Sequence, residues 1–412
     1  MFAWYRELTA PERKTFIAAF GGWSVDAFDF MVYSFVIPTL IAAWGMSKGQ
    51  AGLIATASLI LSAVGGWLAG ILADRYGRVR VLQITIVWFA FFTFLCGFTN
   101  SFEQLLLTRA LQGLGFGGEW AVGSVLIGEM IRSQHRGKAV GTVQSGWAVG
   151  WGAAAIAFAI VFSWLPEEYA WRTLFWLGLL PALLVIYIRR NVKDPEVFEQ
   201  TRAHKTKQGG THFLEIFSPA LLRTTVLASL MTTGMMAGYY AVTTWVPTYL
   251  KTVRGLSVLG TGWYTFVIIV GSLVGYLVAA YCADRLGRRT TFFIFAVGTG
   301  IVAVLYTLIP ISDTLMLFLG FPLGFFLSGN FSGVGAFLTE LFPSRIRGSG
   351  QGFVYNFGRG LGAFAPPLVG YLSANIGLAQ AIGMVTGAAF ATVVLTVTLL
   401  PETRGKQLAV YD

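Results

Sequence analysis

The hydrophobic residues of this 412-residue chain fall into long, nearly uncharged runs that short polar segments separate. Twelve runs are long enough, at about 20 residues or more each, to cross a bilayer as a helix. They span about 16–44, 50–73, 79–99, 102–131, 139–163, 171–188, 223–250, 259–283, 290–310, 313–341, 349–373 and 377–400. Because backbone polar groups in lipid must be satisfied within their own segment, the pattern predicts an all-α membrane protein of twelve transmembrane helices.

The composition agrees with this interpretation and excludes a soluble enzyme. Hydrophobic residues make up 55% of the chain and charged residues 12%, with a mean hydropathy of +0.67. A soluble protein carries about 25% charged residues, so too few are present to cover a chain this apolar. The two cysteines, Cys96 and Cys282, lie far apart within apolar runs. We therefore expect no disulfide framework and no cysteine-based metal site. Because the spans contain no metal-binding cluster of residues and no phosphate-binding loop, we also expect no cofactor.

The basic residues predict how the chain is oriented in the membrane. Placing both termini on one side puts 23 of the 29 lysines and arginines on that side and 4 on the other. This bias indicates that both termini are cytoplasmic. The net charge of +10 is thus a signal of topology, and it predicts no nucleic-acid partner.

An internal repeat divides the chain into two halves. The segment GILADRYGRVR at 70–80 recurs as AYCADRLGRRT at 280–290, and the segment around Glu129 recurs around Glu340. Both matches have an offset of 210 or 211 residues. We therefore predict a six-helix bundle over 1–188, a cytoplasmic linker over 189–222 and a second, pseudo-symmetric bundle over 223–412.

Five charged residues lie deep within the predicted spans: Asp26, Asp29, Arg109, Glu119 and Arg359. Charge at the middle of a bilayer costs about 2.5–3.5 kcal/mol per residue even on the mild insertion scale, so each needs a reason. One alternative is a static ion pair of Arg109 with Asp29. Since three acids then face one nearby arginine in a low dielectric, we also expect one acid, Asp26 before Glu119, to take up a proton near neutral pH.

The two halves differ in their buried charge. The first half contains all three deep acids, whereas the second contains Arg359 and no deep acid. A guanidinium can form two parallel hydrogen bonds with a carboxylate, so Arg359 is predicted to bind an anionic substrate. The alternative is that Arg359 pairs with Asp26 or Glu119. Further polar or aromatic candidates for the same cavity are Asn356, Tyr355, Tyr239, Gln144, Asn330 and Trp120. Taken singly, each of these is more often a packing residue.

Three motifs carry a resemblance to the major facilitator superfamily. The segment Gly70-x3-Asp74-Arg75-Tyr76-Gly77-Arg78 resembles its loop between helices 2 and 3. The segment Arg109-x3-Gly113-x-Gly115-x-Gly117-Gly118-Glu119 resembles its helix 4 signature, and Pro401-Glu402-Thr403-Arg404-Gly405 resembles its exit from helix 12. The pair Asp26 and Asp29 resembles the D-x-x-D pattern of organic-anion:proton symporters, which include aromatic acid, sialate and fungal-type monocarboxylate groups. The opening segment WYREL and the segment WRTLFWLGLLPALL of helix 6 look closest to the sialate and aromatic acid groups.

The resemblance implies a secondary transporter that works by alternating access, as a monomer, in the cytoplasmic membrane. It also implies that the repeated loops form a latch on the cytoplasmic side, with Gly70 allowing close packing and Gly77 a turn. The implied latch residues are Gly70, Asp74, Arg75, Gly77, Arg78, Glu129, Asp284, Arg285, Arg288, Glu340 and Arg347. Ala280 replaces the leading glycine in the second copy, so that latch is expected to be looser.

The leading hypothesis is therefore import of a small organic acid anion, an aromatic or related monocarboxylate, by proton symport. Asp26, Asp29, Glu119 and Arg109 would form the proton-coupling group, with protons as the coupling ion. Sialic acid and lactate-type acids are alternative substrates. Proton-driven drug exporters of this superfamily typically carry a Gly-Pro pair in helix 5, and 141–152 contains no proline, so an exporter is disfavoured. A nutrient sensor would need a sizeable cytoplasmic output domain, and the longest predicted cytoplasmic segment has only about 34 residues.

Overall fold

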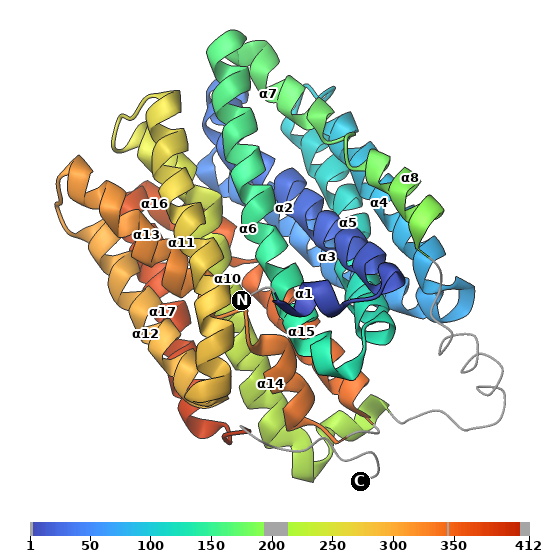
Figure 1. The fold of residues 1–412 in the computed structure, drawn as a ribbon. Helices are drawn as coiled ribbons and strands as arrows, with labels where there is room; N and C mark the ends of the chain where they lie inside the picture. The colour runs from blue at the N-terminus through green and yellow to red at the C-terminus, as the bar shows by residue number, and fades with distance from the viewer. Residues whose placement is uncertain (1–2, 193–212, 344–345, 404–412) are drawn as a thin grey trace. The chain divides into compact units, whose positions relative to one another are not determined.

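The computed structural model describes residues 3–192, 213–343 and 346–403, and these residues form helices without strands (Figure 1). The first part contains α1 (Ala3–Glu7), α2 (Ala10–Trp44), α3 (Lys48–Tyr76), α4 (Arg78–Cys96), α5 (Phe102–Met130), α6 (Ser133–Trp164), α7 (Glu167–Leu177) and α8 (Ala182–Asn191). The second contains a 3-10 helix (Phe213–Phe217), α10 (Pro219–Thr252), α11 (Val258–Arg285), α12 (Arg288–Leu308), α13 (Asp313–Gly329), α14 (Val334–Leu341), α15 (Arg347–Gly362), α16 (Ala365–Ile376) and α17 (Leu378–Leu399).

The twelve predicted apolar runs are recovered, nine as continuous helices and three as broken ones. The continuous helices match their predicted ranges to within a few residues, apart from α2 and α6, which begin six residues early. The breaks divide α7 from α8, α13 from α14 and α15 from α16. In the described chain, ten helical stretches are long and apolar enough to cross a membrane. The predicted all-helical membrane fold is confirmed.

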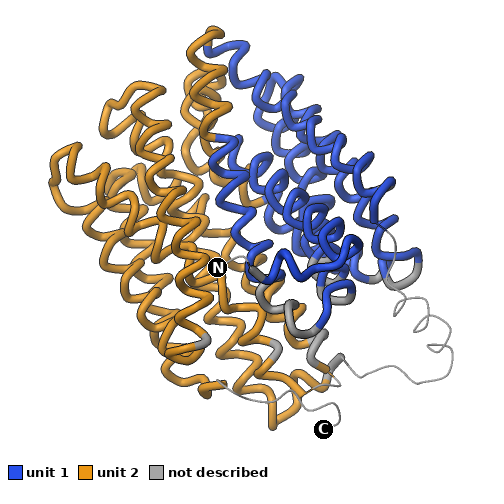
Figure 2. Tube along the Cα trace, in the orientation of Figure 1, with its two compact units in different colours: residues 1–32, 57–154, 167–210 blue, residues 33–56, 155–166, 211–412 orange. Residues whose placement is uncertain are grey.

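The helices form two compact units (Figure 2). Unit 1 comprises residues 1–32, 57–154 and 167–210; unit 2 comprises residues 33–56, 155–166 and 211–412. The boundaries fall inside α2, α3 and α6. The bundle boundaries expected from the sequence repeat stay a prediction, and residues 193–212 of the predicted linker lie outside the described residues.

Glycines let helices approach one another at equivalent places in the two units. In unit 1, a Cβ on Gly113 would stand 2.1 Å from the carbonyl oxygen of Ser58, so α5 touches α3 there. In unit 2, a Cβ on Gly324 would stand 1.8 Å from the carbonyl oxygen of Ile268, where α13 touches α11. The offsets between these pairs, 211 and 210 residues, are those of the sequence repeat. The pseudo-symmetry predicted from the sequence is therefore present in the packing.

Two further glycines shape the repeated loops. Gly77 precedes α4 with φ 103°, and Gly287 precedes α12 with φ 101°. Both angles lie where a side chain is strained and glycine is not. The predicted turn at Gly77 is confirmed, and the repeat provides its equivalent. At Gly70, by contrast, a Cβ would meet no described atom within 4 Å, so the close packing expected of this residue stays a prediction.

We expect Gly117→Ala to destabilise the protein, because a Cβ there would stand 1.6 Å from the carbonyl oxygen of Ser62. The helices α3 and α5 must then separate, and overpacking of this kind costs about 1–3 kcal/mol. The midpoint temperature of thermal unfolding should be lower than that of the unaltered protein. It is measured on purified protein as the loss of the folded peak in size-exclusion chromatography after heating. Gly387→Ala is the control, since a Cβ there meets nothing within 4 Å. Equal midpoints for the two variants would contradict the predicted effect of packing.

Candidate functional site

Two acidic side chains lie against each other in unit 1. Asp26 of α2 is 0% exposed and Glu119 of α5 is 1% exposed, and their carboxyl groups interact. Gly22, one helical turn before Asp26, makes room for this contact: a Cβ there would stand 2.1 Å from Oε1 of Glu119. The glycine is thus part of the acid pair, because any larger residue would displace the carboxyl group of Glu119.

The third acid has a different partner. Asp29 is fully buried on α2, and the guanidinium of Arg109 from α5 attracts its carboxyl group electrostatically, with no hydrogen bond from the described residues at either carboxyl oxygen. Nη1 of Arg109 also donates a hydrogen bond of 3.4 Å to the backbone carbonyl of Asp29. Thr93 of α4 lies beside the same carboxyl group, a neighbour that the sequence pattern did not indicate. The structure therefore brings together the two residues of the ion pair considered from the sequence.

These contacts divide the expected acidic cluster into two parts with different net charge. Arg109 balances Asp29, whereas Asp26 and Glu119 are two acids side by side. Ionising two adjacent carboxyl groups that are shielded from water carries a large electrostatic cost. A proton held between the two carboxyl groups would remove that cost.

Aromatic rings from α2, α5 and α6 pack against one another within unit 1. The Trp23 ring lies 4.4 Å from the Trp120 ring and 4.9 Å from the Trp147 ring, between centroids. Phe30 and Phe116 extend the cluster, with centroids 5.6 Å apart. Trp23 and Trp120 lie within one helical turn of Asp26 and Glu119 along α2 and α5, so the cluster shares these two helices with the acid pair. Trp120, predicted as a substrate contact, belongs to this cluster, and Gln144 lies buried on α6.

The deep arginine of unit 2 lies at the end of a broken helix. Arg359 is 2% exposed and occupies the last turn of α15. The helix stops because Pro366 and Pro367 have no N–H groups to donate to the carbonyls four residues earlier. One of these, the carbonyl of Ala363, instead accepts a 2.6 Å hydrogen bond from the hydroxyl of Thr56. A helix C-terminus favours a cation, which helps to hold the guanidinium at this depth.

Tyrosines from two helices interact with Arg359, and a third tyrosine lies near both of them. The guanidinium carbon of Arg359 lies 5.2 Å from the centre of the Tyr355 ring, and the hydroxyl of Tyr240 from α10 accepts a hydrogen bond from it. Tyr276 of α11 lies close enough to Tyr355 and Tyr240 to interact electrostatically with both hydroxyl groups. Phenols stabilise a guanidinium without neutralising it. Tyr276 was not predicted, because nothing in its local sequence distinguishes it from other aromatic residues in spans.

The second broken helix of unit 2 lies at another predicted residue. Asn330 follows α13, and its amide nitrogen donates to the hydroxyl of Thr299 at 3.2 Å and to the carbonyl of Phe326 at 2.8 Å. The ring of Tyr239 packs edge-on against Phe331 in the break, with centroids 5.1 Å apart. Asn356 donates to the carbonyl of Gly352 on its own helix. These residues fix the local backbone, and their predicted contact with substrate stays a prediction.

Part of the predicted latch falls within the described residues. Nη2 of Arg288 lies 3.2 Å from Oε1 of Glu340, and the hydroxyl of Thr403 donates to Oε2 of the same acid. Glu402 accepts from the backbone N–H of Arg288 at 2.9 Å, so a carboxylate caps α12. Arg78 is half-buried, and Arg285 lies over the ring of Tyr281. The side chains of Asp74, Arg75, Glu129, Asp284 and Arg347 lie outside the described residues.

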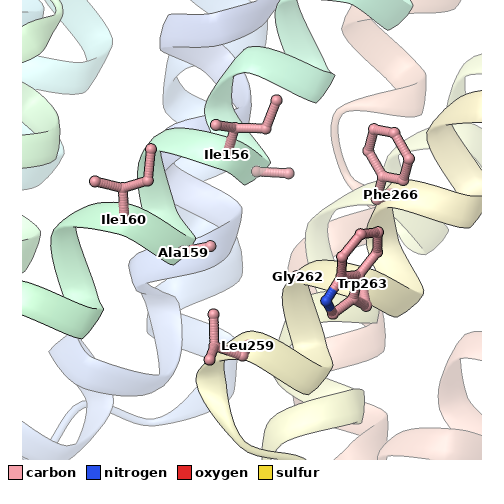
Figure 3. Close-up of a pocket in the computed structure, with 8 residues that line it drawn as sticks. Ile156, Ala159, Ile160, Leu259, Gly262, Trp263 and Phe266 are labelled. Carbon is pink, nitrogen blue, oxygen red and sulfur yellow. The ribbon is translucent and has the colours of Figure 1, made fainter.

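A groove in unit 2 is the wrong place for an anion. It has a volume of about 320 Å³ between the end of α6 and the start of α11 (Figure 3). Ile156, Ala159 and Ile160 face Gly262, Trp263 and Phe266, and the lining includes no charged residue. Its chemistry suits hydrocarbon. The buried acids and Arg359 are therefore the better candidates for a functional site.

Comparison with known proteins agrees with this arrangement. The sequence profile of the Major Facilitator Superfamily matches residues 19–277 and 255–410. A probable 4-methylmuconolactone transporter of Cupriavidus pinatubonensis is 46% identical over 98% of this chain and 94% of its own length. A cis,cis-muconate transport protein of Acinetobacter baylyi is 32% identical over 91% of both chains. The sialic acid transporter of Escherichia coli is 29% identical over 96% of both.

Solved structures show the same fold at lower sequence identity. The crystal structure of a D-xylose–proton symporter aligns with a TM-score of 0.78 and 20% identity, over 96% of this chain and 99% of that one. A bacterial homologue of the human lysosomal transporter Spinster aligns with a TM-score of 0.70 and 18% identity, over 95% of both chains. With the family profile and the relatives, these likenesses identify the chain as a multi-pass membrane protein of the major facilitator superfamily, a family of transporters and not of enzymes.

Proposed function

We propose that this protein imports a small organic acid anion, an aromatic or related unsaturated carboxylate, together with protons by alternating access. The observation that carries the proposal is Arg359, a buried guanidinium at a helix break with tyrosines around it. The names of two relatives support the substrate class, since muconate and a muconolactone are both carboxylic acids.

The anion is proposed to bind in unit 2 through Arg359. A guanidinium presents paired N–H donors that match the two oxygens of a carboxylate. Broken helices, which leave backbone polar groups available at the midplane, are a common way to build such a site in transporters. The ring of Tyr355 suits an unsaturated or aromatic substrate body.

The proton is proposed to bind in unit 1 at Asp26 and Glu119. Coupling requires a group that is protonated on one side of the membrane and deprotonated on the other. A pair of buried acids that shares one proton meets this requirement, whereas the pair of Asp29 and Arg109 is proposed to hold α2 against α5. The orientation proposed from the basic residues has both termini in the cytoplasm, in the inner membrane of a bacterial cell. The transporter is proposed to act as a monomer with no cofactor.

Uptake into proteoliposomes tests the proposal. With the membrane potential clamped at zero, an acid-outside gradient should drive accumulation of radiolabelled cis,cis-muconate, a dianion, by about tenfold for each pH unit if one proton is coupled. Counterflow with unlabelled muconolactone, benzoate, nicotinate, sialic acid and lactate should then rank the substrates, with the unsaturated acids first. Equal accumulation with and without the pH gradient would contradict proton symport. Accumulation that occurs only when the interior is acidic would indicate an exporter.

A further inference from the structure

A second apolar groove lies in unit 1, on the surface formed by α3, α4 and α5. Its volume is about 480 Å³, and all of its lining residues belong to unit 1. None of the buried acids described above lines it. The groove is therefore separate from the proposed proton site.

The groove has a polar end and an apolar length. Tyr76, the last residue of α3, and Arg80, in the first turn of α4, line one end. From Arg80 to Trp88 the groove follows α4 for about 12 Å. Leu72 and Ile84 form its walls, and Ile84 is 55% exposed. Exposed apolar walls in a membrane protein face hydrocarbon, so the charged end marks the level of the lipid headgroups.

The inner end of the groove is closed by close packing of α4 against α5. A Cβ on Gly115 would stand 2.8 Å from the carbonyl oxygen of Thr85 and 2.9 Å from Cδ1 of Trp88, so this glycine lets the two helices approach. The indole N–H of Trp88 donates to the carbonyl of Leu111 at 2.8 Å, which fixes the ring as a wall. The ring of Trp88 therefore forms the inner end of the groove.

The repeat-related surface of unit 2 lacks both features. There Phe326 replaces Gly115 and Gly298 replaces Trp88; a Cβ on Gly298 would stand 2.4 Å from Cδ1 of Phe326, so the phenylalanine fills the space. Thr290 stands where unit 1 has Arg80. The groove with a basic mouth is thus not a general consequence of the fold. The groove of Figure 3, which is apolar throughout, also lacks a basic mouth.

We propose that this groove binds one anionic phospholipid, in the leaflet on the side of the N-terminus. The acyl chain lies along α3 and α4 between Leu72 and Ile84, and the phosphate meets Arg80 with the hydroxyl of Tyr76 beside it. A zwitterionic lipid fits the same apolar walls but has no net charge to offer Arg80. The orientation proposed from the basic residues makes this the cytoplasmic leaflet, whose anionic lipids attract basic side chains.

Native mass spectrometry of the full-length, detergent-purified protein tests the assignment. The protein is titrated with phosphatidylglycerol or with phosphatidylcholine that has the same acyl chains. We expect the first phosphatidylglycerol to bind more tightly than phosphatidylcholine. Arg80→Gln should weaken its binding about five-fold, the effect of one basic residue near a lipid surface, and should leave phosphatidylcholine unchanged. Ile84→Trp, which adds a ring to an exposed wall, should weaken both lipids.

Arg190→Gln is the matched control, because Arg190 is an exposed arginine at the end of α8, on the same side of unit 1. It should leave the first phosphatidylglycerol bound as tightly as in the unaltered protein. Equal losses for Arg80→Gln and Arg190→Gln would overturn the proposal, since they would indicate attraction to charge in general. Unchanged binding in Ile84→Trp, with an unchanged thermal midpoint, would also overturn it.

Discussion

Arg359→Ala should raise the KM for the transported organic anion by about 30- to 1,000-fold while the protein still folds. Removing one partner of a buried, hydrogen-bonded charge pair costs about 2–4 kcal/mol, and every 1.4 kcal/mol is a factor of ten in affinity. Arg359 is 2% exposed, so water cannot replace the lost donors at the carboxylate. Initial rates of uptake over a range of substrate concentrations give the KM, and equilibrium binding to the purified protein gives an independent value.

Two further variants separate the charge of Arg359 from its shape. Arg359→Lys keeps a positive charge but loses the planar fork, so we expect a KM between those of the unaltered protein and the alanine variant. Arg254→Ala removes another arginine of unit 2, whose partner is the partly exposed Asp313. An ion pair of that kind contributes about 0–1 kcal/mol, and the KM should hardly change. Equal KM values for all three variants would refute the proposal that Arg359 binds the carboxylate of the substrate.

The position of Tyr355 beside Arg359 leads to a related prediction about substrate choice. If Tyr355 packs on the unsaturated body of the anion, Tyr355→Ala should weaken muconate or benzoate more than lactate, which has no such body. Tyr355→Phe keeps the ring and should keep this preference. Counterflow with each acid in turn measures the difference. A uniform loss across all acids would instead indicate that the tyrosine only positions the guanidinium of Arg359.

The sequence predicted the helices well because hydrophobic run length is a local property. The breaks at 330–333 and 363–364 were missed, since hydropathy averaged over a span does not register the loss of two N–H donors at Pro366 and Pro367. The residues that cause both breaks are nonetheless recognisable in the sequence. The proline pair lies within a predicted helix, and the stretch from Gly329 to Gly333 contains two glycines and an asparagine.

Pairing between helices was harder to predict than the helices themselves. The deep acids and arginines were recognisable by their depth alone, but which acid meets Arg109 depends on how α2 and α5 are rotated about their axes. Spacing places Asp26 and Asp29 on one face of a helix and does not distinguish them. The contact of Gly22 with Glu119 settles the rotation, because it brings this acid to Asp26 and leaves Asp29 to Arg109.

This division predicts different outcomes for three substitutions that each remove one negative charge. Asp26→Asn and Glu119→Gln imitate a permanently protonated acid, so we expect each to abolish accumulation driven by a pH gradient. Exchange of labelled for unlabelled anion should persist, since it moves no net protons. Asp29→Asn leaves the buried guanidinium of Arg109 without its balancing charge, and breaking a buried ion pair costs about 3–5 kcal/mol. That variant should lose yield and thermal stability instead.

Paired measurements of gradient-driven uptake and of exchange, on protein that elutes as a single species, distinguish these outcomes. Gly22→Ala adds an independent variant: its methyl group must displace Oε1 of Glu119, which it would approach to 2.1 Å, without changing any charge. We therefore expect it to weaken coupling more than exchange, as Glu119→Gln does. Gradient-driven uptake that survives both Asp26→Asn and Glu119→Gln would remove the acid pair as the proton carrier. If Asp29→Asn then lost coupling but kept its stability, the proton would instead travel on the acid beside Arg109.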